Sequence, residues 1–517
     1  MLSLWLDSSQ HPLAEMIPKA YHQPVCPRVK KLLEAINQLQ PTTTIASKDA
    51  VLDEASLKQL FAAGLFSLTV PHEHDGLDTS LRDFVLVMEA IGQLGAAWAM
   101  TAVPHLCISV KAVARYAPAP HRDHILRNIR QTQQLLAFAI TEDQGSDVAA
   151  MRTRLHQVAS GEFILNGRKQ WITNLKRASH VVVACLCPDL HKTPGASVLV
   201  LVDLQQAGVT VSREWEKVCV NGSDTSDLFF DQVKISKEHL LTEPGQGMNA
   251  FLQMVQPGRL GTAAASIGLA RRALTQAKED LALQCTHQQG LDFWVESKAR
   301  LDALSAGLQM CAVFADEQAQ DVPHLVSLMK FISGEMSQSL LQELDHRYVK
   351  HACDLPQIAS NNRDALALFR LLKGPGEILV WQTVLAWSAV VLKPLQEKLN
   401  WPAYLQEDAS YLASHMFSLR QQGGAQQRPS QVDQLARGLA LWWLEMSTHF
   451  ISDEHALELQ PLEIEHAQSW SRQAFSAWRK EIEATPCSLS ANEIDYLFAS
   501  LPQAQERLFD LHVELSA

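Results

Sequence analysis

The sequence lacks the features that mark secreted, membrane-spanning and nucleic-acid-binding proteins. Its first stretch, MLSLWLDSSQHPLAEMIPKA, has no basic start followed by an unbroken apolar core, so no signal peptide is expected. The longest apolar run, Ile378–Leu392, is interrupted by polar residues and is too short to span a bilayer. Lys and Arg number 44 against 56 Asp and Glu, and the net charge of −12 disfavours nucleic acid as the main partner.

Disulfide pairing and metal binding also have little support in the sequence. Nine cysteines occur without a paired framework, as expected for reduced thiols, so we expect a cytoplasmic protein. Cys185 and Cys187 alternate along an apolar strand and are predicted to lie in the core. His72 and His74 have no third ligand beside them, so we expect solvated loop histidines and no metal site.

What is present is an ordinary globular composition in a long chain. Hydrophobic residues make up 47% of the sequence and charged residues 19%, and 517 residues predict two to four domains. Helical periodicity lies on both sides of a strand-rich section, so the fold class is α+β and mostly α. We predict an N-terminal helical domain (1–130), a central β-barrel (131–245), a C-terminal helical bundle (246–395) and an additional C-terminal helical domain (396–517).

The last of these domains carries tryptophans on two amphipathic stretches, Val432–Phe450 and Ala467–Glu483. The residues are Trp442, Trp443, Trp470 and Trp478. Exposed, they could dock on a membrane or a partner. We expect them to be buried instead, because a region of this length needs a core of its own.

Two short clusters in the strand-rich section combine aromatic residues, hydroxyls and glycine. FAITEDQGSD (Phe138–Asp147) and NGRKQWITN (Asn166–Asn174) each have the pattern of a strand end followed by a turn. In each, a hydroxyl (Thr141 or Thr173) follows apolar residues. Side by side, two such strand ends would direct an aromatic face, two hydroxyls and backbone N–H groups toward one cavity. That set suits a flat, redox-active ring.

The order and spacing of these clusters resemble the flavin site of the acyl-CoA dehydrogenase family. Residues 60–92, 221–241, 258–283 and 362–379 also resemble stretches of that family. The resemblance implies FAD as cofactor and a role in lipid metabolism, through α,β-desaturation of an acyl thioester with hydride transfer to the flavin. The implied partners are an acyl thioester of CoA or a carrier protein, an electron-accepting flavoprotein or oxygen, and a second copy of the chain.

The resemblance also assigns roles to individual residues. The implied cofactor-binding residues are Phe138, Ile140, Thr141, Gly145, Ser146, Trp171 and Thr173. Trp171 and Thr173 would approach the ring near N5, whereas Ser146 would lie at the junction of flavin and CoA. Ser146 and Arg259 are the implied substrate-binding residues, since Arg259 matches a family arginine near the thioester.

The catalytic base departs from the family pattern. The two usual positions of the carboxylate are occupied by Lys373 and Gly258. Glu377 is the nearest acidic residue and our candidate catalytic residue, although a carboxylate there could instead satisfy N–H groups at a helix N-terminus. A Lys373 neutralised by burial is the other candidate base.

Three functions therefore stay open at the level of sequence. The first is the thioester dehydrogenase, and the second is a divergent flavin oxidase or monooxygenase of the same fold. The third is a catalytically inactive family member with a binding role. In the family, an Arg-x-x-Phe-Gly motif and a Gly-Gly pair bind the adenine half of FAD. Both are absent from the matching stretches QCTHQQG (284–290) and HRYVKHACDLPQ (346–357). The sequence therefore resembles the family more closely around the flavin ring than around the adenine.

Overall fold

The computed structural model describes residues 25–39, 52–145, 150–191, 195–217, 219–220, 222–284, 288–317, 322–349, 441, 444 and 461–483. These residues belong to two compact units. The larger holds residues 25–283 and the described part of 334–374, and the smaller holds residues 284–333 and the described residues beyond 375.

The larger unit begins with helices. They are α3 (Pro27–Gln38), α4 (Glu54–Ala63), α5 (Leu81–Leu94), α6 (Ala96–Pro104), α7 (Val110–Tyr116) and α8 (Ala119–Thr132), with short turns η1 (Leu65–Ser67), η2 (His72–His74) and η3 (His105–Ser109). Leu57, Leu60 and Phe61 recur at helical spacing in the sequence, which predicts a helix over Ala55–Ala63, and all three are buried in α4. Asp53 starts α4 by accepting a hydrogen bond from Ser56 N at 2.8 Å, and Gly64 ends it at φ 97°.

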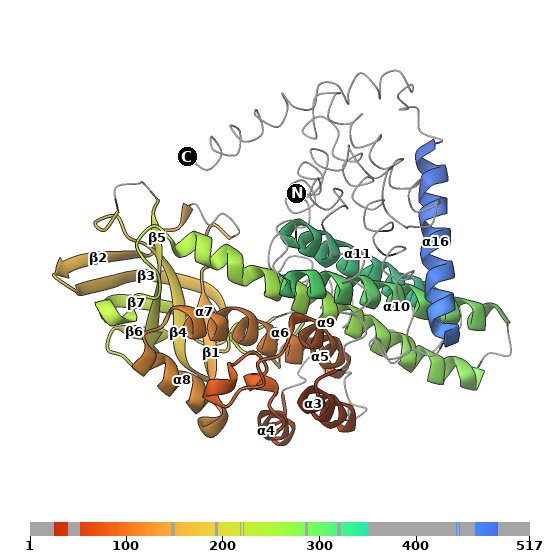
Figure 1. Ribbon diagram of the computed structural model, residues 1–517, viewed down its shortest axis with the longest axis horizontal. Helices are drawn as coiled ribbons and strands as arrows, with labels where there is room; N and C mark the ends of the chain where they lie inside the picture. Colours follow the sequence, from red (N-terminus) through yellow and green to blue (C-terminus); the bar gives the residue numbers. More distant parts are fainter. Residues whose placement is uncertain are drawn as a thin grey trace, which may run out of the picture. The chain divides into compact units, whose positions relative to one another are not determined.

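Seven strands follow and form one curled sheet, which lies at one end of this unit in Figure 1. They are β1 (Leu135–Ala139), β2 (Arg154–Ala159), β3 (Glu162–Thr173), β4 (Ala178–Leu186), β5 (Ser197–Asp203), β6 (Val209–Val211) and β7 (Thr225–Ser236), with the short turn η5 (Lys237–His239) after them. The order is β1-β4-β2-β3-β7-β6, and β5 pairs with β4. Residues with β preference on both sides of Ser160 and Gly161 predict a hairpin, and β2 and β3 pair antiparallel across that turn. The closed barrel stays a prediction, because the pairings among the described strands define only a curled sheet.

A buried histidine joins the helices to the sheet. His105 accepts a hydrogen bond from Leu136 N at Nδ1 (2.9 Å) and donates from Nε2 to Phe66 O (2.8 Å). Burial lowers its pKa to about 4, so the ring is neutral at physiological pH. The helical stretch Ala96–Tyr116 around it is long and apolar enough to cross a membrane, yet 67% of that window is buried, as in a core helix.

Helix α9 (Gly247–Gln284) leaves the sheet and packs closely on α5. A Cβ on Gly268 would lie 2.0 Å from Glu89 O, and one on Gly92 would lie 2.4 Å from Ala265 O. The many small residues of 258–283 predict a close helix approach, and these two contacts confirm it. The contact is also polar, since Arg271 Nε donates to Glu89 Oε1.

In the smaller unit, α10 (Gln288–Asp316) packs against α16 (Pro461–Glu483), and α11 (Val322–Val349) begins there. Trp470 and Trp478 of α16 are buried, as predicted, and the Arg300 guanidinium lies 5.9 Å from the Trp470 ring centre. The other two tryptophans lie outside the described residues. The separate extra domain stays a prediction, because most of residues 396–517 lie outside the described residues.

The predictions for cysteine and histidine have mixed outcomes. Cys185 and Cys187 are buried, as predicted. His72 is exposed, but the prediction of a solvated His74 is wrong, because the loop turns back through Gly76 N to Pro71 O and buries that ring. Within the residues that the structure describes, no group of His, Cys, Asp and Glu could hold a metal ion.

Candidate cofactor and substrate site

The two sequence clusters meet in the sheet. Gln170 N, near the end of β3, donates a hydrogen bond to Thr141 O, just beyond the end of β1, at 2.9 Å. Lys169 Nζ donates to Ile140 O at 3.1 Å. The predicted juxtaposition of two strand ends is therefore present, and side-chain as well as backbone bonds hold it.

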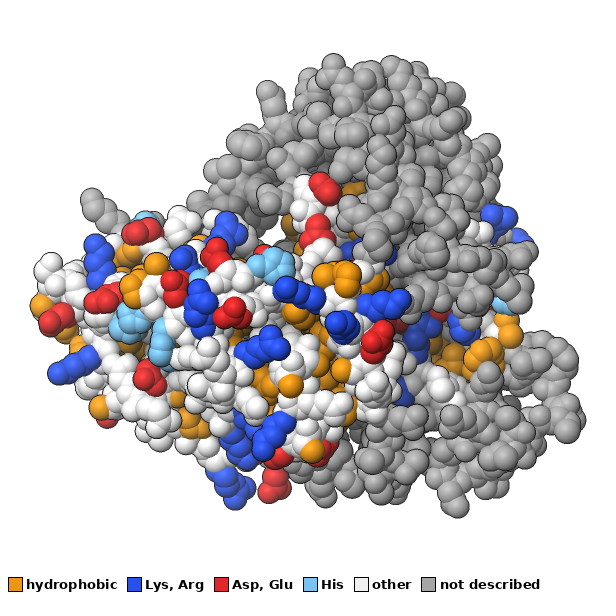
Figure 2. All heavy atoms as spheres, turned by 60° about the horizontal axis from the view of Figure 1, so that its bottom comes forward, with side chains coloured by type: hydrophobic (Ala, Val, Ile, Leu, Met, Phe, Trp, Pro, Cys, Tyr) orange, Lys and Arg blue, Asp and Glu red, His pale blue; other side chains and the backbone are white. Residues whose placement is uncertain are grey.

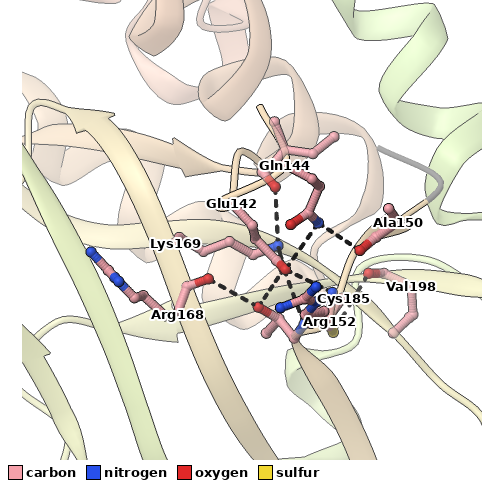
Figure 3. Close-up of polar contacts among 10 residues, drawn as sticks. Glu142, Gln144, Ala150, Arg152, Arg168, Lys169, Cys185 and Val198 are labelled. Carbon is pink, nitrogen blue, oxygen red and sulfur yellow. Dashed lines mark hydrogen bonds and ion pairs between the residues drawn. The ribbon is translucent and has the colours of Figure 1, made fainter. Parts of the chain in front are cut away.

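A buried ion pair fixes this meeting point. The Lys169 side chain is fully buried, and its Nζ lies 2.8 Å from Glu142 Oε1 (Figure 3). Glu142 also accepts from Thr153 Oγ1 at 2.7 Å and from the backbone N of Arg152 and Thr153 at 2.7 and 3.0 Å. Both carboxylate oxygens thus have donors, which is the condition under which a buried charge is tolerated.

The electrostatics keep this carboxylate ionised. Burial raises the pKa of Glu142, but the hydrogen bonds from Lys169 and Thr153 outweigh burial and lower the pKa to about 2. Beside the pair, burial raises the pKa of the Cys185 thiol to about 12, so this cysteine stays protonated. The pair therefore carries no net charge toward the site.

Trp171, two residues beyond Lys169, is unusual in two respects. Its backbone adopts φ 59°, which a bulky residue rarely does, at an irregularity in the β3–β7 pairing between Lys169 and Ile172. Its side chain is 51% exposed, although large aromatic residues are normally well buried. Backbone strain and an exposed aromatic face at one position indicate a functional site.

A neighbouring carboxylate holds the strained turn. Asp227 of β7 accepts from Trp215 Nε1 at 2.8 Å, from Arg168 Nη2 at 2.7 Å and, at 3.4 Å, from Trp171 N. Trp215 stacks on Trp171, with ring centres 4.6 Å apart. One face of Trp171 is therefore supported by protein, which leaves the rest of the ring for a ligand.

Phe138 and Thr173 form the inner part of the site. Phe138 lies at the end of β1 and stacks on Phe251 of α9, with ring centres 5.4 Å apart. Thr173 is buried, and the next residue, Asn174, donates from Nδ2 to Thr101 O of α6 at 2.9 Å. Thr101 Oγ1 and Asn174 Oδ1 are buried without a hydrogen-bond partner, which leaves polar atoms for a bound group.

The remaining predicted residues have varied positions. Ile140 and Thr141 are partly exposed, and Gly145 is exposed at φ 65°, with its N donating to Glu142 O at 3.0 Å. Arg259 was expected at the start of the long helix, but α9 already begins at Gly247, so Arg259 lies well inside it and partly buried. Burial lowers the pKa of Arg259 to about 10, so it remains a cation at neutral pH.

Gly258 is buried within α9. Ser146, Lys373 and Glu377 lie outside the described residues. The sequence analysis missed the residues that support the site, chiefly Glu142 and Lys169. The sequence did carry one signal for them. Lys169 falls at an inward-facing position of β3, and the other side chains on that face of the strand are apolar.

Two regions that contribute residues to this site match models of known protein domains. Residues 30–132 match the family model for the acyl-CoA dehydrogenase N-terminal domain, and residues 137–233 match the model for the acyl-CoA dehydrogenase middle domain. The second match contains both strand ends. The first contains α6, which supplies Thr101.

Individual relatives agree with these matches. The short-chain specific acyl-CoA dehydrogenase of Mus musculus mitochondria is 26% identical over 46% of this chain and 58% of its own length. An acyl-CoA dehydrogenase of Bacillus subtilis is 27% identical over 47% of this chain and 64% of its own length. The chain thus spans less than two thirds of the length of either relative.

A solved structure is similar over a longer range. The acyl-CoA dehydrogenase of Bacillus anthracis complexed with FAD aligns with a TM-score of 0.71 and 17% identity, covering 96% of this chain and 92% of that one. At this identity the likeness shows the fold. The two domain matches, together with the placement of both strand-end clusters, show that residues 30–132 and 137–233 are the N-terminal and middle domains of the acyl-CoA dehydrogenase family.

Proposed function

We propose that this chain is an FAD-dependent oxidoreductase that desaturates an acyl thioester, carried by CoA or a carrier protein, between Cα and Cβ. The observation that carries the proposal is the exposed, backbone-strained Trp171 beside the joined ends of β1 and β3. The relatives support it, because they are acyl-CoA dehydrogenases and a similar fold has been solved with FAD.

The residues present fit a flat, aromatic cofactor. Trp171 offers a half-exposed ring, and the hydroxyls of Thr141 and Thr173 follow the two strand ends. The buried, unpartnered oxygens of Thr101 and Asn174 offer one group that can donate and one that accepts. When bound there, FAD supplies the acceptor for the hydride that leaves the β-carbon.

The chain itself has three tasks in this proposal. Phe138 and Phe251 form an apolar surface that keeps water from the reacting carbons. Arg259 supplies a positive charge for the anionic thioester carrier. Glu377 takes the α-proton on its carboxylate, and an apolar thioester pocket would raise its pKa toward neutrality.

The decisive experiment is a flavin spectrum of the purified protein, followed by anaerobic addition of acyl-CoA thioesters of increasing chain length. Bound FAD with bleaching by one of them is the expected result. A flavin that no thioester bleaches but that oxygen and another substrate turn over would contradict the dehydrogenase. A protein that binds no FAD would contradict any flavin chemistry.

Three substitutions identify the base. Glu377→Gln should abolish bleaching, while Lys373→Met should leave it, because methionine keeps the length of lysine without its amine. If Lys373→Met abolishes bleaching and Glu377→Gln does not, the lysine is the base. If the wild type is inert and Lys373→Glu reacts, the pocket is intact and lacks only a base.

A further inference from the structure

A pocket of about 910 Å³ lies in the N-terminal helical part of the larger unit, among residues not assigned to the flavin site. Its walls come from the start of α3, the end of α4, the η2 loop and the end of α8. A site for a small organic molecule typically measures about 300–1,000 Å³, so this volume far exceeds what a single inorganic ion needs.

The pocket is lined by an excess of positive charge. Three cationic side chains, Arg28, Lys31 and Arg130, line it together with one carboxylate, Asp75. Asp75 already lies 3.3 Å from Arg127 Nη1, outside the pocket lining. Arg28 and Lys31 are exposed, and within the part of the chain that the structure describes neither forms an ion pair. The pocket therefore has cations whose charge is not compensated locally.

The helix start adds to this potential. Helix α3 has twelve residues, with Pro27 in its first turn, and its N-cap residue, Cys26, lines the pocket without a capping side chain of its own. The backbone N of Cys26 donates to Oδ2 of the buried Asp83 at 3.1 Å, so one carboxylate already lies at the helix start. Free N–H groups and the helix dipole at such a start favour an anion. The helix dipole and the side chains of Arg28 and Lys31 thus favour an anion, and the buried Asp83 carboxylate opposes them.

The opposite wall is fixed and partly apolar. A Cβ on Gly76 would lie 1.9 Å from Val70 O, so the η2 loop is packed against its own start. His72 Nδ1 donates to Gly76 O at 3.1 Å, and Arg130 Nη2 donates to Ala62 O at 3.1 Å. Ala62, Ala63 and Leu77 supply apolar surface between these polar groups.

We propose that this pocket binds a small organic molecule bearing a diphosphate or comparably charged phosphate group. The phosphates would lie against Arg28, Lys31 and the first turn of α3, because arginine forms paired hydrogen bonds with phosphate oxygens. The organic part would cover Ala63 and Leu77. Figure 2 brings the side of the molecule that is lowest in Figure 1 forward, and Lys and Arg side chains are scattered there among apolar and acidic ones.

Calorimetry on the full-length, flavin-loaded protein tests the proposal, with ADP, inorganic phosphate and adenosine as probes. ADP should bind at least tenfold more tightly than phosphate, and adenosine should not bind measurably. Arg28→Ala combined with Lys31→Ala should weaken ADP binding at least tenfold. Lys30→Ala removes an exposed charge from the same helix outside the pocket and should change binding less than twofold.

A second measurement localises the bound probe. ADP should slow alkylation of Cys26, which lines the pocket, and leave that of Cys219 unchanged. Unchanged ADP affinity in the double variant would overturn the proposal, and so would adenosine binding as tightly as ADP. Phosphate binding as tightly as ADP would show an inorganic-anion site instead. Flavin content and bleaching by acyl-CoA should not change in the double variant. A failure of the proposed phosphate site can therefore be distinguished from a failure of the proposed dehydrogenase reaction.

Discussion

Lys169 and Trp171 stand two positions apart on β3, and their environments are the reverse of what their chemistry favours. The ammonium group is fully buried, and the indole is 51% exposed. Charged side chains are almost never fully buried unless they are paired, and an exposed large aromatic residue needs a reason. For Lys169 the reason is Glu142, and for Trp171 it is the proposed ring.

The comparison shows that one strand serves two purposes within three residues. In a regular strand, residues two apart point to the same face, so Lys169 and Trp171 would share an environment. The irregular pairing between Lys169 and Ile172, with φ 59° at Trp171, separates them. The buried Lys169 holds the end of β3 in place, and the exposed Trp171 presents an aromatic surface to a ligand.

Breaking the buried pair should give the largest effect. Glu142→Leu leaves Lys169 with Ile140 O as its one hydrogen-bond partner among the described residues, so we expect a loss of about 3–5 kcal/mol in the free energy of unfolding. Lys169→Met should cost less, because Glu142 keeps its bonds from Thr153 and Arg152 N. Urea unfolding followed by circular dichroism measures both.

The double variant Glu142→Leu/Lys169→Met is the control for this prediction. It removes both charges at once, so its stability should exceed that of Glu142→Leu alone. Additive losses in the double variant would contradict the view that the two groups act as a pair.

Acid should weaken the same pair. The pKa of Glu142 falls from its ordinary 4.5 to about 2 in the fold, so its contribution is complete above pH 4.5 and is lost as the pH falls through 4.5 toward 2. The loss is on the order of 3 kcal/mol, from 1.36 kcal/mol per pKa unit. The measurement is the unfolding free energy of wild type and Glu142→Gln against pH. Their difference should shrink over that window, and a constant difference would contradict the assignment.

Removing the exposed ring should act on the ligand and not on the fold. For Trp171→Ala we expect FAD to bind about tenfold more weakly, which corresponds to about 1.4 kcal/mol. The free energy of unfolding without flavin should change by less than about 1 kcal/mol, because half of the ring is already in water. Flavin absorbance per protein after dialysis gives the first quantity. Full flavin retention would argue against the proposed position of the ring.

The smallest effect concerns the backbone at the same residue. Glycine adopts φ 59° without the steric cost that alanine meets, about 1 kcal/mol. Trp171→Gly should therefore be more stable than Trp171→Ala by about that amount, as measured by thermal unfolding. Equal stability would indicate that the bulge relaxes once the indole is gone.

The sequence predicted the elements well where the signal was local. Residue spacing and turn residues predict the β2–β3 hairpin and the end of α4 at Ala63. The inward position of Lys169 on β3 indicates a buried charge, but its partner Glu142 could not be predicted. The burial of His74 was also missed, because it depends on the fold of its own loop and on α8, whose Asp123 Oδ1 lies 3.7 Å from His74 Nε2. The Glu142–Lys169 pair joins residues 27 positions apart, and no periodicity along one strand carries that information.

The parallel pairing of β1 with β4 has a consequence for how the protein folds. Leu135 pairs beside Ala178, so the whole β2–β3 hairpin lies between these two partners in the chain. Local hairpins close quickly, whereas pairing across a long intervening segment is slow. The flavin-side strand end should therefore reach its place late during refolding, after the hairpin has formed. Flavin capture by the refolding chain would then report the last steps of assembly of the sheet.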